Sequence, residues 1–150
     1  MATYYVSTTG NDSDPGTIGS PKATEQAAAA LAGPGDTVYM RGGTYAQRLY
    51  FPSGGTSGSG VITIRNYPSE VVTLIPGDST MAGNASGGGT TPSNSYVTFK
   101  GFVIDGTGTT GFNNGMGVCC HDTGPNHITF EDCEIYFIDK SNFPNELNHG

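Results

Sequence analysis

Two basic residues occupy equivalent places in a repeated pattern, and they are the first candidates for binding chemistry. Arg65 follows the segment Ile62-Thr63-Ile64, and Lys100 follows the segment Val97-Thr98-Phe99. If both segments are stacked strands, the two basic side chains lie one above the other on the outer face of a sheet. Such a column would suit the carboxylates of an acidic polysaccharide. The competing interpretation is a pair of solvated surface charges.

Tyrosine side chains accompany these basic residues. Tyr67 closes the segment that contains Arg65, and Tyr96 opens the segment that contains Lys100. An aromatic ring with a polar tip can stack on a sugar, so we interpret both tyrosines as carbohydrate-binding candidates. Packing at a sheet edge is the alternative explanation for both.

Carboxylates are what a calcium site would need, because Ca²⁺ takes several oxygen ligands. Asp12 and Asp14 lie close together in one loop and are weak candidates, although hydrogen bonds within a turn explain them as well. The later acidic residues form no column, since the repeat places Asp105 on Tyr136 rather than on another acid. The sequence therefore gives two weak candidates and no metal site that we assign.

The histidines and cysteines favour structural roles. His121 and Asp122 would point to opposite faces of a strand, and hydrogen bonds at coil corners explain these residues and His127 better than catalysis does. We expect Cys120 and Cys133 to fill the core and Cys119 to face outward. A disulfide between Cys119 and Cys120 or between Cys120 and Cys133 remains open, and no catalytic residue is assigned.

The elements that would position these residues repeat along the chain. Ile62-Thr63-Ile64, Val97-Thr98-Phe99 and Ile128-Thr129-Phe130 each read apolar-Thr-apolar, at spacings of 35 and 31 residues. The alternation has the period of a strand, and a repeat of a few tens of residues indicates a solenoid of stacked units. The sequence therefore predicts an all-β fold, a β-solenoid.

Composition and charge narrow the partners. The chain has 24 glycines among 150 residues and only 13% charged residues, which is typical of a turn-rich β protein. Its net charge of −7 disfavours nucleic acid and anionic membranes as partners. No segment is as long as a membrane span, and no signal peptide opens the chain. We expect an extracellular protein, either secreted or virion-associated.

We predict a single β-helix domain over residues 1–150. A helix over Thr24–Leu31, with Thr24 as its N-cap and Gly33-Pro34 as its stop, would cover the first coil. No such cover follows the last coil, so we expect either the N-terminal part of a longer solenoid or self-association through an open C-terminal edge. The predicted parts are a cap of strand, loop and helix (1–35), coils (36–140), a long lateral loop (76–94) and an uncapped tail (141–150).

The predicted strands are short and are bounded by Gly, Asn, Asp and Pro. They cover Tyr4–Ser7, Thr37–Met40, Leu49–Phe51, Val61–Tyr67 and Val71–Ile75, with a turn at Gly42–Tyr45. The segments Tyr96–Asp105, Gly115–His121 and His127–Ile138 complete the coils, and we expect each coil to give two or three strands with Gly, Asn or Asp at its corners.

The chain resembles right-handed parallel β-helix repeat proteins related to family-9 polysaccharide (pectate) lyases, over roughly residues 4–140. The residues that carry the resemblance are Tyr4-Tyr5-Val6-Ser7, Gly10-Asn11-Asp12, Gly16-Thr17, Ser20-Pro21, Ala23-Thr24, Pro34–Tyr39, Gly42-Gly43-Thr44-Tyr45, Ile62-Thr63-Ile64-Arg65 and Tyr96–Phe102. The resemblance implies three parallel sheets with a helical cap at the first coil. For the lyases of this group it also implies calcium held by an acidic cluster and a basic residue that abstracts a proton. No residue of this chain matches that cluster.

Two hypotheses of function follow. In the first, the chain is the N-terminal portion of an extracellular β-helix protein that binds or cleaves acidic polysaccharide by pectate-lyase-like β-elimination, with the catalytic coils absent from this chain. In the second, it is a non-catalytic structural or adhesive module, such as part of a phage tail spike or a self-assembling surface fibre. An enzyme fragment should be monomeric, whereas a structural module should assemble end to end.

Overall fold

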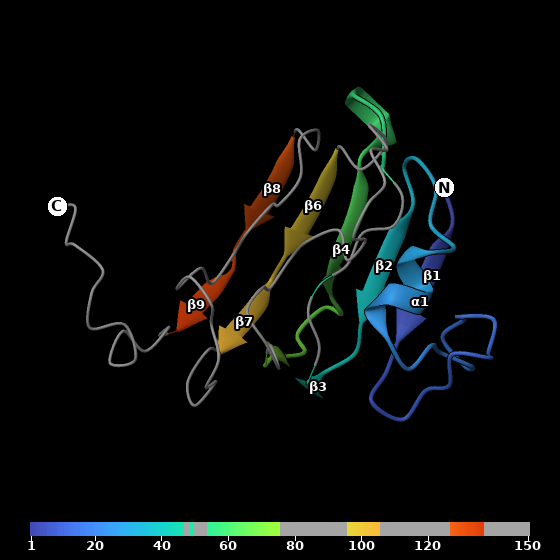
Figure 1. Ribbon diagram of the computed structural model, residues 1–150, viewed down its shortest axis with the longest axis vertical. Coiled ribbons are helices and arrows are strands. Elements are labelled where there is room, and N and C mark those ends of the chain that lie inside the picture. The colour runs from blue at the N-terminus through green and yellow to red at the C-terminus, as the bar shows by residue number, and fades with distance from the viewer. Residues whose placement is uncertain (47–48, 50–53, 76–95, 106–126, 137–150) are drawn as a thin grey trace, which may run out of the picture.

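Parallel strands dominate the computed structural model, which describes residues 1–46, 49, 54–75, 96–105 and 127–136. Within each sheet every neighbouring pair of strands is parallel, so the chain adds one strand to each sheet per coil (Figure 1). This confirms the predicted all-β solenoid. One sheet has the order β1 (Thr3–Val6), β2 (Thr37–Met40), β4 (Ile62–Asn66), β6 (Val97–Lys100) and β8 (Ile128–Glu131), and the other has the order β3 (Gly43–Tyr45), β5 (Val72–Leu74), β7 (Phe102–Asp105) and β9 (Glu134–Tyr136).

The sequence repeat is the register of the five-stranded sheet. Thr63 pairs with Thr98, and Thr98 pairs with Thr129, as the spacings of 35 and 31 residues predict. The same shift of 31 residues places Asp105 on Tyr136 in the four-stranded sheet. Each strand therefore buries the same alternate positions as its neighbour.

The core lies between the two sheets and is built from these alternate positions. In the five-stranded sheet, Val38, Ile64 and Phe99 stack in register, and all three are fully buried. In the four-stranded sheet, Leu74 and Ile104 form a similar column. Cys133 packs half-buried against this core, as expected for a small apolar filler.

The first coil is covered by α1 (Glu25–Ala29), as the sequence predicted (Figure 1). Thr24 is its N-cap, and the hydroxyl of Thr24 accepts a hydrogen bond of 3.2 Å from the Ala27 amide. The helix ends earlier than expected, because the amides of Leu31 and Ala32 bond to carbonyls three residues back and tighten the last turn. No helix within the described residues is long and apolar enough to cross a membrane.

One local prediction is corrected. Gly42–Tyr45 was predicted as a turn, but Gly43–Tyr45 is β3, whose Tyr45 is buried and pairs with Leu74. The predicted strands Val61–Tyr67 and Val71–Ile75 are confirmed as β4 and β5, which lie in different sheets. Leu49 forms an isolated bridge and is fully buried.

Each of the coil segments Tyr96–Asp105 and His127–Ile138 contains two strands separated by a corner, as predicted. The left-handed residue is Gly101 in the first case (φ 76°) and Asp132 in the second (φ 51°). The chain therefore turns from one sheet to the other at these positions. Other predictions lie outside the described residues: the segment Gly115–His121, the loop 76–94, the tail 141–150, and the residues Tyr50, Phe51, Cys119, Cys120, His121 and Asp122.

Candidate functional site

Arg65 and Lys100 lie side by side on the outer face of the five-stranded sheet, because they are register partners across β4 and β6. The basic column that the repeat predicted is therefore present. Both residues line an open hollow of about 330 Å³ where the chain turns from one sheet to the other. The other residues that line it are Asn66, Glu70, Val71, Gly101, Phe102, Val103, Asp132 and Glu134.

Lys100 is held by acidic residues of the next coil. Its Nζ lies 3.0 Å from Oε2 of Glu131 and 3.2 Å from Oδ2 of Asp132. These two carboxylates raise the pKa of Lys100 above its ordinary value, with the hydrogen bond to Glu131 as the larger cause. Because protein carboxylates already occupy this cation, Lys100 is a poor candidate for binding an external anion.

Arg65, in contrast to Lys100, forms no ion pair within the described residues. Its Nε is buried and, within the described residues, donates no hydrogen bond. The guanidinium lies 5.7 Å from the centre of the Tyr39 ring, a distance at which a cation is attracted by the ring face. The Arg65 side chain also lines the hollow, so its charge is available to an external carboxylate there.

Tyr67 follows β4 and packs into a group of aromatic rings. Its centre lies 5.6 Å from that of Tyr39 at an interplanar angle of 71°, and the guanidinium of Arg41 lies 4.7 Å from it. Tyr5 in turn stacks on Tyr39 at 5.9 Å. Because the rings and Arg41 cover one another, this cluster offers ring edges and phenol groups rather than open faces for stacking on a sugar.

Tyr96 is separated from the other candidates. It precedes β6, whereas Arg65 and Tyr67 lie at the C-terminal end of β4, the opposite end of this parallel sheet. Tyr96 stacks on His127 with ring centres 4.4 Å apart, and both residues are left-handed corners. The structure therefore brings Arg65 together with Lys100 and Tyr67, and it does not bring Tyr96 to that site.

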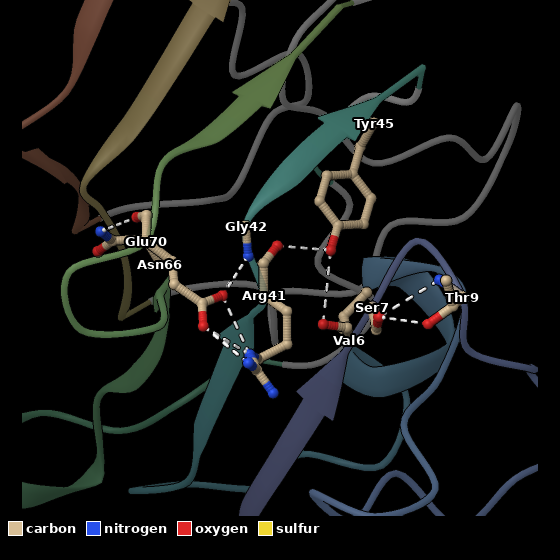
Figure 2. A network of polar contacts seen from close by, with 8 residues as sticks. All are labelled: Val6, Ser7, Thr9, Arg41, Gly42, Tyr45, Asn66 and Glu70. Carbon is tan, nitrogen blue, oxygen red and sulfur yellow. Dashed lines mark hydrogen bonds and ion pairs between the residues drawn. The ribbon is translucent and has the colours of Figure 1, made fainter.

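Arg41 and Glu70 form a clasp that the sequence did not predict (Figure 2), and Glu70 also lines the hollow. Arg41 donates through Nε and Nη2 to Glu70 at 2.8–3.0 Å, and the Gly42 amide donates to the same carboxylate. Tyr45 donates a hydrogen bond of 2.7 Å to the Arg41 carbonyl, and burial raises the pKa of Tyr45 to about 12. Arg41 and Glu70 are 29 residues apart, which matches neither of the two repeat spacings, so the repeats could not have indicated this pair.

The clasp makes stability depend on pH. Arg41 first, and the Gly42 amide second, hold the pKa of Glu70 below its ordinary value of 4.5. A lowered folded-state pKa stabilises the fold above pH 4.5, and this contribution disappears as the pH falls through the folded-state value. We expect Glu70→Gln to be less stable than the wild type at pH 7, with a difference that closes as the pH falls toward 3.

Urea unfolding between pH 7 and 3 measures this difference. Asp14→Asn is a suitable control, because the Asp14 side chain makes no hydrogen bond or ion pair within the described residues. This control should follow the wild type at every pH. A Glu70→Gln deficit that stayed constant across the range would show that the ionisation of Glu70 does not contribute to stability.

Asp12 has a structural position. Its Oδ1 accepts hydrogen bonds from the amides of Ala23 and Thr24 at 2.9 and 2.8 Å, and its Oδ2 accepts one of 2.9 Å from the Thr24 hydroxyl. Asp12 thus ties the loop to the start of α1. Among the described residues no group of three or more His, Cys, Asp or Glu side chains is arranged to hold a metal ion, so no step of the chemistry is assigned to calcium.

Comparison with known proteins gives a sequence family and several structures with the same fold. Residues 4–146 match the family described as the Pel9A-like, right-handed β-helix region. The uncharacterized protein YwoF of Bacillus subtilis (strain 168) is 43% identical over 75 residues, which are 50% of this chain and 16% of YwoF.

Two solved enzymes share the architecture. The GH136 lacto-N-biosidase from Eubacterium ramulus aligns with a TM-score of 0.62 and 18% identity over 89% of this chain and 27% of the enzyme. A rhamnogalacturonan lyase aligns with a TM-score of 0.58 and 22% identity over 90% of this chain and 36% of the lyase. The chain thus spans about a sixth of YwoF and about a third or less of the two enzymes.

Proposed function

We propose, from the premise that this chain belongs to the Pel9A-like right-handed β-helix family, that it is the N-terminal portion of an extracellular protein that binds an acidic polysaccharide. In this proposal the described coils bind the polymer, and cleavage by β-elimination belongs to coils outside this chain. The shares of 27% and 36% that the chain covers in the two β-helix enzymes support the idea of a longer solenoid.

The observation that carries the proposal is the state of Arg65. This cation lines the hollow and forms no ion pair within the described residues, whereas the competing cation Lys100 is bound to Glu131 and Asp132. A guanidinium presents a planar fork that matches a carboxylate. A uronate residue supplies that carboxylate together with the hydroxyls of the sugar ring.

The test is binding of galacturonate oligomers to variants at Arg65, measured by calorimetry. Arg65→Ala should weaken binding about ten- to a hundredfold, the range expected for a hydrogen bond to a charged group. Arg65→Lys should bind with intermediate strength, because an ammonium keeps the charge but not the fork. Lys100→Ala should have a smaller effect than Arg65→Ala.

A neutral galactose oligomer of equal length is the matched ligand, and its binding should not respond to Arg65. Circular dichroism of each variant separates lost binding from lost folding. If the wild type bound charged and neutral oligomers equally well, or bound neither, the proposal would be wrong.

A structural, self-associating module is the second candidate. Within the described residues β8 and β9 are the last strands of their sheets, and Ile135 on β9 is 54% exposed. An exposed strand edge with an apolar side chain is a template for pairing with another chain. Light scattering distinguishes the two candidates, because ordered trimers or filaments favour the structural module and a monomer favours the carbohydrate-binding portion.

A further inference from the structure

The outer face of the five-stranded sheet carries an uninterrupted ladder of threonines. Thr3, Thr37, Thr63, Thr98 and Thr129 are register partners from β1 to β8. Their hydroxyls repeat at the spacing of neighbouring strands, which is about 4.8 Å. None of the five side chains makes a hydrogen bond within the part of the chain that the structure describes, so the ladder offers donors and acceptors in a straight row.

A second ladder of register partners runs beside the first, and the type of side chain in it changes along the solenoid. Its members in order are Tyr5, Tyr39, Arg65, Lys100 and Glu131. The row is therefore aromatic at the N-terminal coils, cationic in the middle and acidic at the last described coil. The phenol groups of Tyr5 and Tyr39 also make no hydrogen bond within the described residues.

These two ladders fit a linear polymer that crosses the strands. Neighbouring strands lie about 4.8 Å apart, which is close to the length that one pyranose ring adds to an extended chain, so successive sugars can meet successive strands. Threonine and tyrosine hydroxyls both donate and accept, which suits the hydroxyls of sugars. Arg65 fixes the position of one carboxylate, because it lines the hollow and forms no ion pair with a described carboxylate.

The charges also fix the direction of the polymer from Arg65. Toward the C-terminal coils it would meet Glu131 and Asp132, whose negative charges repel a uronate and whose partner Lys100 is already engaged. Toward the N-terminal coils it meets only hydroxyls and aromatic edges on β2 and β1. The footprint is therefore three strands wide.

We propose that an acidic polysaccharide lies across β4, β2 and β1, parallel to the solenoid axis, with a uronate carboxylate on Arg65 and later sugars on the hydroxyls of Thr37, Tyr39 and Thr3. This inference rests on the proposed function and adds to it the direction and length of the bound chain. It predicts that sites on β6 and β8 of the same sheet take no part.

NMR titration tests this footprint, because it detects weak binding and maps the contacted strands. Affinity should rise from galacturonate monomer to trimer and change little beyond it, with amide shifts on β1, β2 and β4. Thr37→Val, which replaces a hydroxyl by a methyl group in a good strand former, should weaken trimer binding about two- to tenfold and leave monomer binding unchanged.

Two controls carry the same substitution at other places. Thr129→Val lies on the same ladder at the acidic end, and Thr73→Val lies on the four-stranded sheet. Both should bind like the wild type. Binding that depended on Arg65 but gained nothing from chain length, or shifts on β6 and β8, would overturn the footprint and leave the proposed function standing. If no galacturonate oligomer bound, both would be overturned.

Discussion

Replacing Phe99 with alanine is expected to lower the free energy of unfolding by about 3–5 kcal/mol, the range for removing a large aromatic side chain from a core. Phe99 is fully buried, and its ring stacks on that of Phe130 with centres 5.2 Å apart and an interplanar angle of 24°. Its strand β6 lies between β4 and β8, so the cavity would loosen the coil below and the coil above.

Urea unfolding followed by circular dichroism measures this loss. The matched control is Thr98→Val, which changes the adjacent residue on the outer face of the same strand and should stay within about 0.5 kcal/mol of the wild type. If Phe99→Ala lost less than about 1 kcal/mol, the interior at this coil would be able to collapse around the missing ring.

The sequence predicted the sheets well because a solenoid repeats its burial pattern. Ile64 and Phe99 stand in the same place of successive repeats, and the same alternation then places Arg65 and Lys100 on the outside. β3 was not predicted, because its short sequence does not show this repeated alternation. Only Tyr45 of its three residues is apolar, and the neighbouring residues Gly42 and Gly43 are typical of a turn. The pairing with β5 is what identifies this segment as a strand.

The candidate site was predicted as a set of positions but not as a set of bonds. The repeat register places Lys100 beside both Arg65 and Glu131, so the ion pair between Lys100 and Glu131 could have been predicted from the shift of 31 residues. The second contact of Lys100, with Asp132, depends on the conformation of the corner that contains Asp132 and could not be predicted from the repeat. Three threonines of the ladder, Thr63, Thr98 and Thr129, are in contrast visible in the apolar-Thr-apolar repeats, which define the period but do not by themselves indicate a binding role.

Replacing Gly101 with alanine is the second change with a large expected effect, about 2–4 kcal/mol of lost stability. Gly101 has a φ of 76°, and a Cβ built there would lie 2.2 Å from Oδ1 of Asn66. The left-handed backbone alone does not require glycine, because Asp132 adopts a φ of 51° at the equivalent corner one coil later. The close approach of Asn66, whose Nδ2 donates a hydrogen bond of 2.9 Å to the Glu70 carbonyl, is therefore the specific constraint.

A double-mutant cycle with Asn66→Ala separates the two contributions to this loss. The truncated side chain removes the atoms that the new Cβ would meet, so Gly101→Ala in that background should lose only the backbone term of about 1–2 kcal/mol. Unfolding free energies of the four proteins give the coupling directly. If Gly101→Ala lowered the stability equally with and without the Asn66 side chain, the strain would lie in the backbone alone. Glycine would then be required at this corner by its φ angle rather than by the packing of β4 against β6.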